Sequence, residues 1–86
     1  MNIHPTCVGI DISKATLDVA DGAVGHVESF ANTASAADDL ATRWQRQGSF
    51  VVFEATAPYD RHIKAALETA GVCHARVNPL RARDFA

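Results

Sequence analysis

Two acidic residues stand at the ends of apolar segments in this sequence. Asp11 lies within the run TCVGIDI at residues 6–12, and Glu54 closes the run SFVVFE at residues 49–54. An unpaired charge inside a buried strand is unfavourable, so each carboxylate is expected at the exit of its strand or beside a compensating cation. Mg²⁺ and Mn²⁺ prefer carboxylate oxygens, and a pair of such ions can clamp a phosphodiester during its cleavage. The two acids therefore indicate metal-dependent phosphoryl transfer on a nucleic acid.

The elements that would position these acids follow from the spacing of the apolar residues. Apolar runs predict strands at residues 6–12, 16–21, 26–32, 49–54 and 72–78. Apolar residues at helical spacing predict helices over 33–48 and 58–71, each stopped by a glycine. A third helix is predicted to begin with Asn78 as its cap and Pro79 at its first position. The element order is therefore β-β-β-α-β-α-β, followed by the start of a helix.

This order predicts an α/β fold with one mixed, five-stranded sheet. Three meander strands followed by strand–helix crossovers give the spatial order 3-2-1-4-5, in which the first and fourth strands are parallel neighbours. Right-handed crossovers place both complete helices on one face and leave the other face bare unless a following segment covers it. Asp11 and Glu54 then lie side by side at the carboxyl-end edge of the sheet, where open α/β sheets bind ligands.

Both acids also have an ordinary structural explanation. Asp11 could accept the backbone amides of the turn that follows it, and Glu54 could cap the second helix near its N-terminus. Spacing alone does not decide between these roles and metal binding, although the paired placement favours a metal more than either acid alone would.

Side-chain positions on the two complete helices follow from the same periodicity. Trp44 falls on the apolar stripe of the first helix and Tyr59 on that of the second, so both are predicted to pack in the core. Asp60, Lys64 and Glu68 are spaced four residues apart and are predicted to form a solvated face.

Composition bounds the class of protein. The chain has 86 residues, enough for one domain, and its formal net charge of −2 lacks the basic footprint of an autonomous nucleic-acid binder. Cys7 and Cys73 lack metal-site spacing and are predicted to be small buried side chains, the alternative being a disulfide or metal role. With no leader and no membrane-spanning run in the sequence, a reducing, cytoplasmic location is expected.

Three longer motifs carry a family resemblance. The segments GIDISKATLDVA, FEATAPYDRHIKAAL and RVNPLRARDFA begin at residues 9, 53 and 76. In order and spacing they resemble the amino-terminal part of the DEDD-type transposases of bacterial insertion sequences, relatives of the Piv and MooV site-specific DNA invertases. The resemblance covers essentially the whole chain and implies an RNase H-like (RuvC-like) domain. It also implies that Asp11 and Glu54 bind Mg²⁺ or Mn²⁺ for DNA strand cleavage and exchange, with DNA and a structured guide-like RNA as partners.

The chain departs from the family pattern in several places. The family's third and fourth acids form an Asp-x-x-Asp pair downstream of the Val-Asn-Pro helix, and a separate C-terminal domain supplies a nucleophilic serine; this sequence contains neither. Asp84 lies inside a matched segment and is interpreted as an ordinary helix residue, and Ala57 stands where the family usually has glycine. We therefore expect residues 1–86 to be a single incomplete RNase H-like domain, truncated before its C-terminal helix. It is expected to bind metal weakly and to be inactive alone.

Basic side chains near the acids are candidates for nucleic-acid contacts. Lys14 follows Asp11 in the first turn, and Arg81 and Arg83 lie near the start of the last predicted helix, so each could contact a phosphate backbone. A solvated surface position is the alternative for all three. Ser13 is interpreted as a turn residue and not a nucleophile, because no histidine occupies a plausible base position.

Two other functions compete with a recombinase fragment. A bare sheet face would drive self-association, so the main alternative is a non-catalytic oligomerisation or regulatory module from a truncated transposase, and a homo-oligomer is expected. A sugar- or acetate-kinase-like ATPase lobe shares the opening hairpin and the first aspartate. The turn sequence DISKAT, however, lacks the glycine-rich phosphate loop that such a lobe needs.

Overall fold

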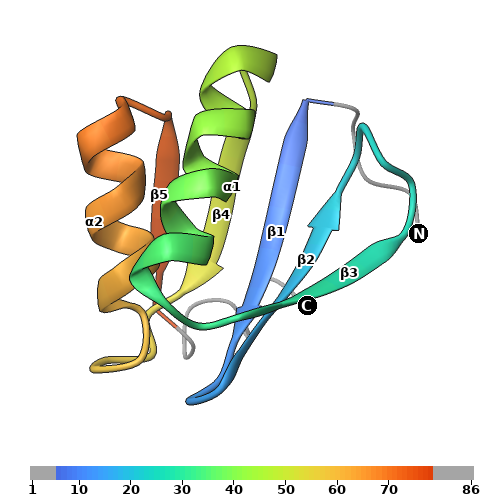
Figure 1. The fold of residues 1–86 in the computed structure, drawn as a ribbon. Helices are drawn as coiled ribbons and strands as arrows, with labels where there is room; N and C mark the ends of the chain where they lie inside the picture. The colour runs from blue at the N-terminus through green and yellow to red at the C-terminus, as the bar shows by residue number, and fades with distance from the viewer. Residues whose placement is uncertain (1–5, 79–86) are drawn as a thin grey trace.

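A computed structural model describes residues 6–78 of the chain as strands and helices built around one sheet (Figure 1). In chain order they are β1 (Cys7–Ile12), β2 (Thr16–Asp21), β3 (Val27–Ala31), α1 (Ala34–Gln47), β4 (Phe50–Glu54), α2 (Arg61–Ala70) and β5 (His74–Val77). The predicted elements of this region are confirmed, and their boundaries agree closely except at the start of α2. The third predicted helix, whose first position is Pro79, lies outside the described residues.

The sheet has the predicted order β3-β2-β1-β4-β5. β1 pairs antiparallel with β2 and parallel with β4, and β5 joins β4 in parallel. Both helices cover the same face of this sheet (Figure 1). The reason is that the two crossovers, from β3 to β4 and from β4 to β5, move in the same direction and are right-handed. The mixed α/β sheet with helices on one face is therefore confirmed.

The core lies between the two helices and the face of the sheet that they cover. Side chains alternate along a strand, so every second residue of β1, β2 and β4 points into this core. Trp44 is fully buried there, as predicted. The buried apolar residues are Val8, Ile10, Ile12, Leu17, Val19, Ala37, Leu40, Ala41, Trp44, Val51, Phe53, Ile63, Ala66, Leu67 and Val72.

Both helices end at a glycine, as the sequence predicted, and a threonine hydroxyl caps the start of α1. Thr33 is the N-cap of α1, and its side chain accepts a hydrogen bond from the amide of Ala36 at 3.1 Å. Gly48 ends α1 and Gly71 ends α2, with φ angles of 68° and 70° that favour glycine. Within residues 6–78 no helix has the length and apolar character of a membrane span.

The start of α2 differs from the prediction. The helix begins at Arg61, and the residues before it form a turn in which the amide of Tyr59 donates to the carbonyl of Thr56 at 2.8 Å. The amide of Arg61 donates to the carbonyl of Pro58 at 3.3 Å, which continues this tighter turn. Tyr59 therefore lies outside the helical stripe and is 43% exposed. Its predicted packing in the core is wrong.

The prediction of a solvated Asp60 is also wrong, because this residue is only 3% exposed. Its carboxylate accepts from Arg76 Nε at 2.7 Å and from the amide of Thr56 at 3.3 Å. An ion-paired and hydrogen-bonded carboxylate avoids much of the penalty that an isolated buried charge would carry. Lys64 and Glu68 are exposed, as predicted.

The two cysteines are free thiols with different surroundings. Cys7 is half-buried in β1, whereas Cys73 is exposed. The predicted burial is therefore wrong for Cys73. This residue lies in the connection between Gly71 and β5, and β5 is an edge strand, so few neighbouring side chains cover it.

The opposite face of the sheet is not covered by either helix. Small side chains lie along it, and Gly9, Ala20 and Val52 are half-buried. Larger apolar side chains are open to solvent, since Val27 is 51% exposed and Phe50 is 41% exposed. Among the described elements, this uncovered face is the one that carries Asp11 and Glu54, the acids near the ends of β1 and β4.

Candidate functional site

Asp11 and Glu54 lie at the ends of neighbouring parallel strands. In the β1–β4 register Ile10 is opposite Phe53, so each acid is the next residue beyond this pair. Because Ile10 and Phe53 are buried toward the helices and side chains alternate, both acids point to the uncovered face. The structure thus brings the two acids to one place.

Both acids line an open hollow of about 470 Å³, which we call the acidic hollow. It is lined by Gly9, Ile10, Asp11, Asp18, Ala20, Val27 and Glu54. Three of these described lining residues are carboxylates and none of them is basic, so the charge of the acidic hollow favours cations.

The third carboxylate, Asp18 of β2, is directly opposite Asp11 in the antiparallel β1–β2 register. Its Oδ1 accepts a hydrogen bond from Ser29 Oγ at 2.6 Å. Sequence reasoning did not assign Asp18 to the site. The alternation in TLDVAD, combined with the register of the opening hairpin, places Asp18 on the same face as Asp11 and could have identified it.

In the described part of the chain, the carboxylates of Asp11 and Glu54 take part in no hydrogen bond or ion pair. Ser13 closes the turn after β1, as predicted. Its amide donates to the carbonyl of Thr16 at 2.9 Å, and the hydroxyl oxygens of Ser13 and Thr16 lie 2.8 Å apart. The N-cap of α2 is Asp60 and not Glu54. Neither ordinary structural role considered for the two acids is therefore observed here.

These two carboxylates suit a hard divalent cation that is shared with a ligand. Mg²⁺ is commonly held by one or two carboxylates, while waters and substrate phosphate complete its coordination. Across residues 6–78, no group of three or more His, Cys, Asp or Glu side chains is arranged to hold a metal ion. A cation at Asp11 and Glu54 would therefore need further ligands from water, from a substrate or from outside the described residues.

The backbone that carries Glu54 is fixed by its neighbours. The amide of Ala55 donates to the carbonyl of Val77 in β5 at 2.7 Å, and Thr56 Oγ1 donates to the carbonyl of Glu54 at 3.3 Å. The buried carboxylate of Asp60 accepts from the amide of Thr56, which ties this segment to the start of α2. These bonds fix the position of the backbone from which the Glu54 side chain projects.

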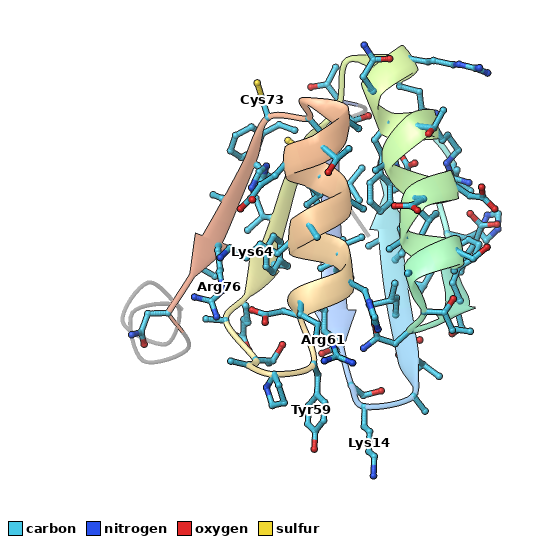
Figure 2. All side chains as sticks on the ribbon, turned by 60° about the vertical axis from the view of Figure 1, so that its left-hand side comes forward. Lys14, Tyr59, Arg61, Lys64, Cys73 and Arg76 are labelled. Atoms are coloured by element: carbon cyan, nitrogen blue, oxygen red, sulfur yellow. The ribbon has the colours of Figure 1, made fainter. Side chains whose placement is uncertain are left out.

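Of the three residues predicted to contact a nucleic acid, one, Lys14, lies among the described residues. Lys14 projects from the turn between β1 and β2 and is exposed (Figure 2). Arg81 and Arg83 lie outside the described residues. Tyr59 and Arg61, which sequence reasoning did not connect with a nucleic acid, line a hollow together with Lys14.

No model of a protein family matches this chain. No curated protein matches it in sequence.

Proposed function

We propose that residues 1–86 form the N-terminal part of an RNase H-like (RuvC-like) domain of a DNA transposase or site-specific recombinase. In this proposal Asp11 and Glu54 are ligands of Mg²⁺ or Mn²⁺. The observation that carries it is the placement of both carboxylates, unpaired, in one hollow at the ends of neighbouring parallel strands. The mixed sheet order and the motifs that resemble DEDD-type transposases support the same proposal.

The roles of the acidic residues follow from their positions. Asp11 and Glu54 bind the cation through carboxylate oxygens, and Asp18 adds to the negative potential of the acidic hollow. A bound divalent ion lowers the pKa of an attacking water or hydroxyl and stabilises the charge on the phosphoryl oxygens. The resemblance places further acids in an Asp-x-x-Asp pair beyond the matched segments, so residues 1–86 alone are expected to cleave no DNA.

DNA cleavage tests this proposal in a polypeptide that joins residues 1–86 to the Asp-x-x-Asp segment of a transposase of the resembled family. We expect Mg²⁺-dependent strand cleavage that Asp11→Asn and Glu54→Gln each reduce by more than about 100-fold, because loss of even an outer-shell partner of a metal reaches that size. Asp39→Asn, which removes an exposed acid of α1, serves as the control and leaves the rate unchanged. Undiminished cleavage by either site variant would refute the assignment of the two ligands.

A second candidate function is a non-catalytic oligomerisation module, because the uncovered sheet face exposes Val27 and Phe50 beside small side chains. Analytical sedimentation at several protein concentrations tests this candidate, because it measures whether the chain self-associates. If this face pairs with a second copy, the chain forms dimers, and Phe50→Lys raises their dissociation constant by about 10-fold. Tyr59→Ala, which removes an exposed aromatic ring at the other end of β4, is the control. A monomer at every concentration excludes this candidate.

A further inference from the structure

A second hollow, of about 350 Å³, lies where the β1–β2 turn, the end of β3 and the start of α2 meet. We call it the basic hollow, and it is lined by Lys14, Asn32, Pro58, Tyr59, Arg61 and His62. None of these described lining residues is acidic, although the whole chain has a net charge of −2. Near the ends of β1 and β4, three carboxylates therefore line one hollow, and Lys14 and Arg61 line another.

The cations of the basic hollow have no carboxylate partner in the described part of the chain. Lys14 and Arg61 are exposed and form no ion pair there. By contrast, Arg43 and Arg76 each pair with a buried aspartate. Figure 2 shows Lys14 projecting from the same end of the molecule as Tyr59. These two cations are thus available to an anion from outside the described residues.

The loops that carry these side chains are joined by Asn32. Its Nδ2 donates to the carbonyl of Ser13 at 2.8 Å and to the carbonyl of Tyr59 at 2.9 Å. Its backbone amide donates to the carbonyl of Ala15 at 2.9 Å. One residue therefore fixes the spacing between the turn of Lys14 and the loop of Tyr59, and the basic hollow is formed without a ligand.

The start of α2 carries a buried carboxylate, Asp60, between Tyr59 and Arg61 in the sequence. Asp60, at the N-cap, makes no side-chain hydrogen bond to the first amides of the helix. Its carboxylate instead accepts from Thr56 and from Arg76. The carboxylate of Asp60 offsets the partial positive charge at the N-terminus of α2, so the positive charge of the basic hollow comes from the side chains of Lys14 and Arg61.

We propose that the basic hollow binds the phosphodiester backbone of a single nucleic-acid strand, with a neighbouring base stacked on Tyr59. Cations that follow a backbone, combined with an exposed aromatic ring on which a base stacks, are the general means of binding single strands without sequence preference. The inference rests on the proposed function for the class of ligand. It adds that Lys14, Tyr59 and Arg61 hold the strand whose cleavable bond lies at the acidic hollow.

Titration of the 86-residue chain with a fluorescent oligothymidylate of about six nucleotides tests this inference. EDTA is present, so metal binding plays no part. Lys14→Ala and Arg61→Ala are each expected to weaken binding about 5-fold and to reduce the slope of log K against log salt concentration by about 0.7. Tyr59→Ala is expected to weaken binding about 10-fold, whereas Tyr59→Phe retains it. Lys64→Ala removes the same charge from α2 outside the basic hollow and leaves the affinity unchanged.

Two further ligands separate the contribution of base stacking from that of phosphate binding. The affinity for an abasic strand of equal length should not change with Tyr59→Ala, because no base is present to stack on the ring. Inorganic phosphate should bind much more weakly than the oligonucleotide. Amide NMR spectra establish that each variant is folded. Equal weakening by Lys64→Ala and Arg61→Ala, or an oligonucleotide that binds no better than phosphate, overturns the inference.

Failure of this inference and failure of the proposed function are distinguishable. If the oligonucleotide does not bind but Mn²⁺ binds at Asp11 and Glu54, the nucleic-acid role of the basic hollow is wrong and the metal site stands. If the oligonucleotide binds as expected and Mn²⁺ does not, the proposed metal site is wrong and the basic hollow stands.

Discussion

Replacing Asp21 with alanine is expected to lower the free energy of unfolding by about 3 kcal/mol. The Asp21 side chain is fully buried and accepts from Trp44 Nε1 at 3.1 Å, from Arg43 Nη2 at 3.2 Å and from the amide of Ala23 at 2.9 Å. Alanine leaves the indole N–H of Trp44 buried without its acceptor, and among the described carboxylates Arg43 keeps its ion pair with Glu28, at 3.7 Å. A domain of this size has a total stability of about 5–15 kcal/mol, so the loss is a large part of it.

Urea unfolding followed by circular dichroism measures this loss. Asp21→Asn retains the shape and part of the hydrogen bonding, so we expect a smaller decrease of about 1–2 kcal/mol. Asp18→Ala is the matched control because Asp18 lies in the same strand and faces the uncovered side of the sheet, and its effect should remain below about 1 kcal/mol. Similar losses for Asp18→Ala and Asp21→Ala would show that the buried network does not stabilise the fold.

The order of strands and helices could be predicted because its signals are local. The alternation in TLDVAD differs from the helical spacing of Leu40 and Trp44, and glycines mark both helix ends. The start of α2 could not be predicted in this way. Asp60 is buried because Arg76, sixteen residues later in β5, reaches it. No periodicity within one helix contains that information, so the helical pattern predicts the wrong surroundings for both Asp60 and Tyr59.

The two hollows also differ in whether the sequence could predict them. Asp11 and Glu54 each close an apolar strand, and the topology alone brings them to one edge of the sheet. The basic hollow depends on Asn32, whose side chain joins a turn and a loop from distant parts of the chain. An asparagine after a strand gives no sign of such a contact in the sequence. The sequence therefore suggested Lys14 by itself as a nucleic-acid contact, which stays a prediction, but it did not associate Lys14 with Arg61.

Removing either carboxylate at the two strand ends is expected to abolish specific Mn²⁺ binding by the 86-residue chain. Two unpaired carboxylates with open coordination positions should bind the ion weakly, with a dissociation constant on the order of 1 mM. With one of them neutralised, the affinity should fall by about 10-fold, to that of an ordinary surface acid. Asp11→Asn and Glu54→Gln test this, and Asp39→Asn is the control for a general change in charge.

The most direct measurement is the paramagnetic broadening that Mn²⁺ causes in the amide NMR signals of the chain. If one cation lies between the strand ends, the signals of Asp11 and Ile12 and those of Glu54 and Ala55 broaden first, in the unsubstituted chain and in Asp39→Asn. The same signals then stay sharp in Asp11→Asn and in Glu54→Gln. Broadening spread evenly over all the acidic residues, or unchanged at the strand ends after either substitution, would show that the two acids do not hold a common metal ion.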